Sequence, residues 1–188
     1  MKTEKNITIG SYKFTQYCSR ADILDRTFDL ARQITNDYRN SEQEPVLLLL
    51  MTGGIYLGVD LSRALDELGC LHVVDSIGLR RYTKDEVGGA VGITSLSRTD
   101  LSGRDVIVVD DIVDHGDTMN FLHNYWQVAE QKPKSVKYCT MFLKSNHKPL
   151  DFELDYLGWP VGPEWLVGNG MDSEGLGRGL EDIYIRVK

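Results

Sequence analysis

Short apolar runs recur along the chain and alternate with stretches of helical spacing. Two of these runs, Val46–Met51 and Val106–Val109, are apolar throughout and too short to form helices of their own. Unbroken runs of this kind are typical of strands in a parallel sheet that is covered on both faces. We predict these two strands and two more, at Leu71–Leu79 and Ser135–Leu143.

Three amphipathic helices are predicted between and before these strands. Their core-facing residues recur at helical intervals: Ile23, Thr27, Leu30, Ile34 and Tyr38; Leu57, Leu61, Leu65 and Leu68; and Met119, Leu122, Trp126 and Ala129. Ser19 and Asp22 have the spacing of a capping box at the start of the first helix. Gly69 and Pro133 follow the ends of the other two. Helices and strands that alternate in this way predict an α/β fold with a parallel sheet.

Both ends of the sequence depart from this alternation. Residues 1–18 carry a weak alternating pattern, which predicts an edge strand or a hairpin without chemistry of its own. Residues 151–188 hold two tryptophans and several glycines, which favours a small irregular lobe above the sheet. We therefore expect an α/β core at 1–150 and a C-terminal lobe at 151–188.

A polar, glycine-bearing stretch at about 80–103 interrupts the core. Loops of this length inside a compact domain are usually functional lids, and a solvent-exposed loop is the other interpretation. A lid at this place would keep water away from a reacting ligand.

Composition narrows the range of partners and the cellular compartment. The formal net charge of −7 disfavours a general nucleic-acid surface or an anionic membrane as partner. Cys18, Cys70 and Cys139 are odd in number and lack CxxC spacing, which argues against a disulfide framework or zinc site and fits a reducing compartment. No apolar run reaches membrane-spanning length, and residues 1–10 lack an apolar signal region, so we expect a cytoplasmic protein.

The candidate chemistry follows the run Val106–Val109. Asp110, Asp111 and Asp114 come at the carboxyl end of this predicted strand, where open α/β sheets bind ligands. The turn at 116–118 precedes a helix, so its backbone N–H groups and the helix dipole favour a phosphate. A sugar phosphate carries hydroxyl groups for the acids and a phosphate for the turn.

Two other classes of site also use neighbouring acids. The acid pocket of a phospho-accepting receiver domain usually follows the first strand, whereas a strand–helix unit already precedes Asp110 here. A calcium loop places carboxylates at alternate positions, and Ile112 and Gly116 interrupt that register. A sugar-phosphate site is therefore the favoured interpretation.

The stretch VIVVDDIVDHGDTM at 106–119 resembles the binding signature of the type I phosphoribosyltransferases, which use phosphoribosyl pyrophosphate (PRPP). The resemblance implies a Rossmann-like parallel-sheet core, with Asp110 and Asp111 at the ribose hydroxyls of PRPP. It implies that Asp114 is the catalytic residue and manages a proton near purine N7. The implied cradle for the 5′-phosphate consists of His115, Gly116, Asp117 and Thr118.

Two further stretches resemble the pyrophosphate side of this family. Met51-Thr52-Gly53-Gly54 resembles the pyrophosphate loop, with Thr52 in place of the family's lysine, and implies that Thr52 and Gly53 bind PRPP. The glycines also fit an ordinary tight turn. Leu79-Arg80-Arg81-Tyr82 resembles a Leu-Lys-Ser-Tyr stretch, which implies that Tyr82 covers the pyrophosphate and that Arg81 replaces the serine.

Residues 144–180 resemble the base-covering hood of the hypoxanthine-guanine phosphoribosyltransferases, which implies a small C-terminal hood. The resemblance implies that Lys144 donates to a 6-oxo group, that Tyr156 stacks on the base and that Leu157 contacts the ring through its backbone. From the pattern alone, a solvated lysine at the end of a strand and a small apolar core around Tyr156 are the other interpretations.

The same resemblance implies that the protein uses Mg²⁺. Asp172 is the implied magnesium ligand, with Asp110 and Asp111 as further candidates. Arg178 is implied to bind PRPP at its pyrophosphate.

The expected activity is transfer of the 5-phosphoribosyl group from PRPP to a 6-oxopurine, hypoxanthine or guanine, which gives IMP or GMP and pyrophosphate in purine salvage. Because an ammonium group donates hydrogen bonds and accepts none, adenine is expected to be a poor substrate. The resemblance also implies a homodimer or homotetramer. The alternative is a non-catalytic regulator that binds PRPP or nucleotides on the same fold, which the acidic balance disfavours.

Overall fold

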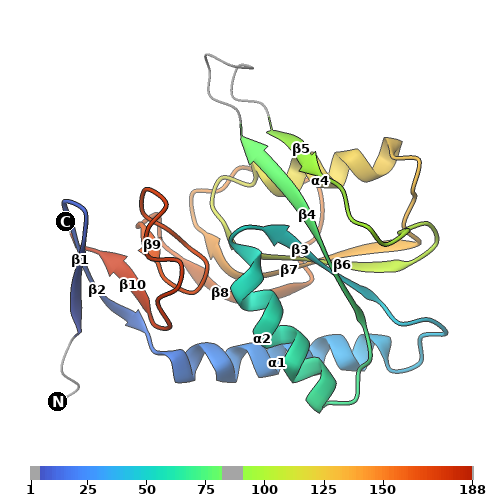
Figure 1. The fold of residues 1–188 in the computed structure, drawn as a ribbon, viewed down its shortest axis with the longest axis horizontal. Helices are drawn as coiled ribbons and strands as arrows, with labels where there is room; N and C mark the ends of the chain where they lie inside the picture. Colours follow the sequence, from blue (N-terminus) through green and yellow to red (C-terminus); the bar gives the residue numbers. More distant parts are fainter. Residues whose placement is uncertain (1–4, 82–90, 188) are drawn as a thin grey trace.

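The computed structural model describes residues 5–81 and 91–187, which form two sheets and the helices that cover the larger one (Figure 1). The strands are β1 (Asn6–Ile9), β2 (Tyr12–Cys18), β3 (Val46–Met51), β4 (Val73–Arg81), β5 (Val91–Ser95), β6 (Asp105–Val113), β7 (Ser135–Lys144), β8 (Tyr156–Val161), β9 (Leu166–Val167) and β10 (Ile183–Arg186). The helices are α1 (Arg20–Tyr38), α2 (Gly54–Glu67) and α4 (Asp117–Val128).

The central sheet has the strand order β5-β4-β3-β6-β7-β8. The neighbours from β4 through β8 pair in parallel, and β5 pairs antiparallel with β4 at one edge. The four strands predicted from the sequence correspond to β3, β4, β6 and β7. The expected α/β fold with a mostly parallel sheet is therefore confirmed.

Successive residues of each central strand pack on opposite faces of this sheet. In β3, Leu47 and Leu49 belong to the core beneath α1 and α2, whereas Leu48 and Leu50 belong to the core beneath α4. Helices α1 and α2 thus cover one face and α4 covers the other (Figure 1). Both faces exclude water, which explains why β3 is apolar at every position.

Helix α1 begins at the predicted capping box. The Ser19 hydroxyl accepts a hydrogen bond from the backbone N–H of Asp22, and the Asp22 carboxylate accepts one from the backbone N–H of Ser19. These bonds satisfy two N–H groups that the first turn leaves without helical partners. The predicted apolar stripe of this helix, which includes Ile23, Leu30 and Ile34, is fully buried. Within the described residues, no helix is long and apolar enough to cross a membrane.

The second sheet joins the two ends of the chain. Its strand order is β1-β2-β10-β9, with antiparallel pairing throughout. It lies beside the central sheet and stands apart from α4 (Figure 1). The weak alternation predicted as a hairpin is therefore the β1–β2 half of this sheet, and Phe14 and Tyr184 help to form its own core with Val167.

Three expected boundaries are corrected by the structure. Strand β8 pairs with β7, so the central sheet extends past the predicted limit at 150 to Val161. We use "hood" below for residues 162–187. Strand β6 continues beyond Val109 to Val113, because Asp110, Ile112 and Val113 still pair with β7. Within the predicted lid at about 80–103, residues 91–95 are the strand β5; residues 82–90 lie outside the described part.

Candidate active site

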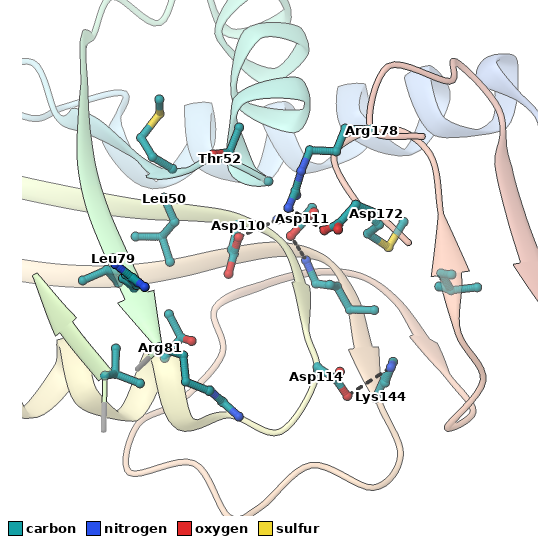
Figure 2. A pocket seen from close by; sticks show the side chains of 18 of the residues that line it. Leu50, Thr52, Leu79, Arg81, Asp110, Asp111, Asp114, Lys144, Asp172 and Arg178 are labelled. Carbon is teal, nitrogen blue, oxygen red and sulfur yellow. Dashed lines mark hydrogen bonds and ion pairs between the residues drawn. The ribbon is translucent and has the colours of Figure 1, made fainter. Parts of the chain in front are cut away.

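A cavity of about 300 Å³ lies beyond the carboxyl ends of β3, β4 and β6 and is closed on one side by the hood (Figure 2). Its position agrees with the general rule for ligand sites in open α/β sheets. The charged residues that line it are Arg80, Arg81, Asp110, Asp111, Asp114, Lys144, Asp172 and Arg178. Thr52, Gly53 and Thr118 also line this cavity, so it gathers most of the residues predicted for PRPP.

Asp110 and Asp111 form an acidic pair near the end of β6. Asp111 is 7% exposed, and its Oδ1 accepts a hydrogen bond from the backbone N–H of Ile112 at 2.8 Å. Burial, followed by the negative charge of Asp111, raises the pKa of Asp110 well above its ordinary range. Burial also raises the pKa of Asp111. Two carboxylates held this close favour a ligand that brings hydroxyl donors or a cation.

The acidic pair packs tightly because two glycines lie against it. A Cβ atom at Gly53, in the turn after β3, would overlap the carboxylate of Asp111. A Cβ atom at Gly170, in the hood, would overlap the backbone oxygen of Gly53 and touch Asp111. Gly170 also has a φ of 109°, which L side chains rarely adopt. The hood therefore rests directly on the turn predicted to hold pyrophosphate.

Lys144 and Asp114 form an ion pair at the other end of the cavity. Lys144 ends β7, is 5% exposed, and places its Nζ 3.0 Å from Asp114 Oδ1 (Figure 2). The same Nζ lies 5.3 Å from the centre of the Trp165 ring. A donor, an acceptor and an aromatic face thus meet at one place, as recognition of a flat heterocyclic base requires. The solvated-lysine interpretation is wrong, because Lys144 is buried.

Tyr156 and Leu157 do not lie in this cavity, which corrects their predicted roles. Tyr156 is 2% exposed and packs in the core beneath α1, where its hydroxyl donates to Asp37 at 2.7 Å. The backbone oxygen of Leu157 accepts a hydrogen bond from Arg26. Trp165 and Leu166 line the cavity in their place. In the sequence, Trp165 precedes the apolar pair Leu166-Val167, a pattern that fits a core aromatic as well as a cavity residue.

The predicted phosphate cradle forms the turn between β6 and α4. Gly116 is the N-cap of α4 with a φ of 86°, so the turn depends on a residue without a side chain. A hollow of about 70 Å³ lies in this turn and is lined by Arg81, Asp110 and residues 112–119. His115 Nδ1 is 3.4 Å from Asp114. The N-terminus of α4 and its free N–H groups suit a phosphate here.

The hood supplies the last predicted residues of the site. Arg178 and Asp172 form an ion pair of 2.5 Å, and Arg178 also donates to the backbone oxygen of Gly170 at 2.6 Å. The Trp165 indole donates to the backbone oxygen of Asp172 at 2.9 Å. These contacts tie the cationic, acidic and aromatic groups of the hood into one unit beside Asp111 (Figure 2). Tyr82 lies outside the described residues.

The carboxylates of the cavity fit Mg²⁺ that is shared with a phosphorylated ligand. In the described part of the chain, no group of three or more His, Cys, Asp or Glu side chains could enclose a metal ion by itself. Mg²⁺ commonly keeps several waters and binds one or two carboxylates together with substrate phosphates. Asp110, Asp111 and Asp172 offer such oxygens along the cavity.

Comparison with known proteins agrees with this geometry. Residues 19–166 match a family model described as a phosphoribosyl transferase domain. The hypoxanthine-guanine phosphoribosyltransferase of Aquifex aeolicus is 33% identical over 166 residues, which cover 87% of this chain and 89% of that protein. The chain belongs to the purine phosphoribosyltransferase family. The hypoxanthine phosphoribosyltransferase of Salmonella typhimurium is 32% identical over 158 residues, 81% of this chain and 83% of that protein.

The fold of this phosphoribosyltransferase is shared with solved structures. A hypoxanthine-guanine phosphoribosyltransferase from Bacillus anthracis superposes with a TM-score of 0.80 at 28% identity, covering 96% of this chain and all of that one. The expected type I phosphoribosyltransferase fold is therefore confirmed. The relatives are named as enzymes, so the enzyme interpretation is confirmed and the non-catalytic regulator is not supported.

Proposed function

We propose that this enzyme transfers the 5-phosphoribosyl group of PRPP to a 6-oxopurine, hypoxanthine or guanine, and forms IMP or GMP and pyrophosphate in purine salvage. The observation that carries the proposal is the ion pair between the buried Lys144 and Asp114 beside the ring of Trp165. The names of the relatives support the same two bases.

At the base, each of these three residues has a distinct role. Trp165 stacks on the purine, and Lys144 Nζ donates a hydrogen bond to the 6-oxo oxygen. Asp114 takes the proton of purine N7 as N9 attacks the ribose. Adenine presents an amino group at position 6, which leaves the ammonium of Lys144 without an acceptor, so the site discriminates against it.

At the sugar, N9 forms a bond to C1 while the C1–O bond breaks and its electron pair leaves with pyrophosphate. Asp110 and Asp111 accept hydrogen bonds from the ribose hydroxyls, and their negative charge favours the cation-like ribose. Arg178 donates to the departing pyrophosphate. Asp172, with Asp110 or Asp111 as further ligands, would hold Mg²⁺, which would supply positive charge to the leaving group when bound.

The test is an assay of pyrophosphate release with PRPP and Mg²⁺, in which hypoxanthine, guanine, xanthine and adenine are offered separately. We expect release with hypoxanthine or guanine and little release with adenine. Turnover of adenine at a comparable kcat/KM, or no turnover of either 6-oxopurine although PRPP binds, would contradict the proposal.

We further propose that the enzyme acts in the cytoplasm as a homodimer or homotetramer. Three cysteines that form no disulfide among the described residues fit a reducing compartment. Light scattering coupled to size exclusion measures the oligomeric state directly, and a monomeric mass at assay concentrations would overturn that part of the proposal.

A further inference from the structure

Three charged side chains meet at the rim of the turn between β6 and α4. Arg81 Nη2 is 3.0 Å from Asp117 Oδ2, and Lys148 Nζ is 2.6 Å from Asp117 Oδ1. They come from the end of β4, the first turn of α4 and the segment after β7. One carboxylate thus faces two cations. The cluster therefore places net positive charge beside backbone N–H groups that already favour an anion.

Arg81 and Lys148 differ in whether they line the cavities of the site. Arg81 lines both the 300 Å³ cavity and the 70 Å³ hollow in the turn. Lys148 is not among the described residues that line either space. Figure 2 shows Arg81 extending from β4 toward the segment that follows β6. Arg81 is therefore the cation of this cluster that can contact a ligand in the turn.

The ion pair leaves Arg81 able to change partners. A guanidinium group has five N–H donors in a planar fork that matches phosphate oxygens. The hydrogen bond from Lys148 is the main cause of a pKa of Asp117 below its ordinary value, so this carboxylate keeps a cationic partner if Arg81 departs. Moving one arm of Arg81 from a carboxylate to a phosphate exchanges one charge-assisted hydrogen bond for another.

The turn after β3 does not supply a comparable charge to the cavity. The turn after β3 carries Thr52 and Gly53, neither of which is cationic. In the described residues of the cavity wall, Lys144 is paired with Asp114 and Arg178 with Asp172. Arg81, by contrast, is paired with an acid that has a second cation.

We infer that Arg81 binds the 5′-phosphate of PRPP and that Asp117, neutralised by Lys148, positions Arg81 for this contact. The inference deepens the proposed function and rests on it. It also gives Asp117 a role that its charge would otherwise contradict, because its carboxylate engages two cations at the rim of the phosphate cradle.

The experiment is calorimetric titration with ribose 5-phosphate and, separately, with pyrophosphate and Mg²⁺. Arg81→Gln and Lys148→Gln each remove one positive charge that pairs with Asp117. Asp117→Asn is made with and without Arg81→Gln. We expect Arg81→Gln to weaken ribose 5-phosphate binding roughly 10-fold or more, the scale of one charge-assisted hydrogen bond. Lys148→Gln should weaken it less than about threefold, the scale of an exposed charge. Binding of pyrophosphate should be nearly the same in all variants.

The double variant separates ligand binding from simple neutralisation of Asp117. If Arg81 only balances that acid, its removal costs nothing once Asp117 is Asn; we expect a similar loss in both backgrounds. Equal losses for Arg81→Gln and Lys148→Gln, or a loss confined to pyrophosphate, would overturn the inference. An inactive wild type that binds no ribose 5-phosphate would overturn the proposed function as well, whereas normal turnover with unchanged binding in Arg81→Gln would overturn this inference alone.

Discussion

At the scale of single residues, Lys144 is the most informative position of the site. It ends a strand whose neighbouring residues Met141 and Phe142 are fully apolar and buried, yet it carries a charge at 5% exposure. Burying an unpaired ammonium costs several kcal/mol, so the position is tolerable because Asp114 and the Trp165 ring face it. A buried ammonium group lowers the stability of the fold, but it can donate hydrogen bonds to a ligand.

Replacing Lys144 with Met should therefore weaken binding of the base far more than binding of PRPP. We expect the Kd for hypoxanthine to rise roughly 10- to 100-fold, as for loss of a hydrogen bond to a charged donor, with the Kd for PRPP changed less than about threefold. Calorimetric titration with each ligand measures both constants. Lys137→Met is the matched control, because Lys137 lies on the same strand but pairs with Asp37 outside the cavity. Equal losses for both ligands would remove Lys144 from the base site.

The aromatic residue that stacks on the base can be identified by a second pair of variants. Trp165→Ala should weaken hypoxanthine binding by about 1–3 kcal/mol, the usual value of stacking one base on an aromatic ring. Tyr156→Phe should leave that affinity unchanged and lower the free energy of unfolding by about 1 kcal/mol, because the hydroxyl loses its bond to Asp37. The checks are calorimetry and urea denaturation, and an unchanged hypoxanthine affinity in Trp165→Ala would contradict the assignment of Trp165 as the stacking residue.

At the scale of elements, α1 holds the edge strand β8 on the central sheet. Arg26 donates to the backbone oxygens of Gly158 and Leu157 at 2.8 and 2.7 Å. Asp37, near the end of the same helix, accepts hydrogen bonds from Tyr156 and Lys137. These contacts join segments a hundred or more positions apart.

That separation in sequence explains why the helices and strands were easier to predict than the direction in which their side chains point. Apolar runs and helical spacing are local, so β3, β6 and α1 followed from the sequence. The side of β8 on which Tyr156 points depends on Asp37, which is 119 positions away. Trp165 and Tyr156 each stand near glycine and aliphatic residues, and spacing alone did not distinguish the cavity residue from the core residue. The acids at the carboxyl end of β6 were predictable because chemistry and strand end coincide in one continuous stretch.

The bond between Asp37 and Lys137 should make stability depend on pH. Lys137, and then Tyr156, lower the pKa of Asp37 below its ordinary value. A carboxyl whose folded pKa lies below its unfolded value stabilises the fold above the unfolded value, about 3.9, and loses that contribution as pH falls through the folded pKa. The difference in free energy of unfolding between wild type and Asp37→Asn should be under about 1 kcal/mol at neutral pH, because the pair is partly exposed, and should vanish in acid.

Urea denaturation at neutral pH and at pH values below the unfolded pKa measures this difference. Asp29→Asn is the control, because Asp29 lies on α1 and its ion pairs, with Arg26 and Arg32, stay within that helix. If acid reduces the difference in unfolding free energy between wild type and Asp29→Asn by the same amount, the pH dependence does not come from the contact between α1 and β7.

At the scale of the whole molecule, the hood contacts the core at Arg20, the first residue of α1. Arg20 donates two hydrogen bonds to Asp60, at 2.5 and 2.8 Å, and so joins α1 to α2. Its backbone N–H donates to Asp182, and its guanidinium lies 3.5 Å from the buried Asn169. Asn169 has a φ of 46° and precedes Gly170, which packs on the acidic pair. These long-range contacts, unlike the strands, left no local pattern from which the hood could be placed.

Removal of Arg20 should therefore destabilise the fold. Asp60 is 9% exposed, and Arg20→Met leaves its charge without this partner, so we expect a loss of about 2–4 kcal/mol of unfolding free energy. Combining it with Asp60→Leu should recover part of the loss, because the second change removes the orphaned charge. Urea denaturation of the two single variants and the double variant completes the cycle, and strictly additive losses would refute this account.

The strand order of the small sheet affects how the enzyme folds during its synthesis on the ribosome. Strand β2 is translated early, but its partner β10 emerges only after the entire central sheet has been made. Until then one edge of β2 stays open to pairing with other nascent chains, the situation in which newly made proteins need chaperones. Asp172 and Arg178 lie between β9 and β10. A half-made polypeptide therefore lacks the groups proposed to bind the leaving diphosphate.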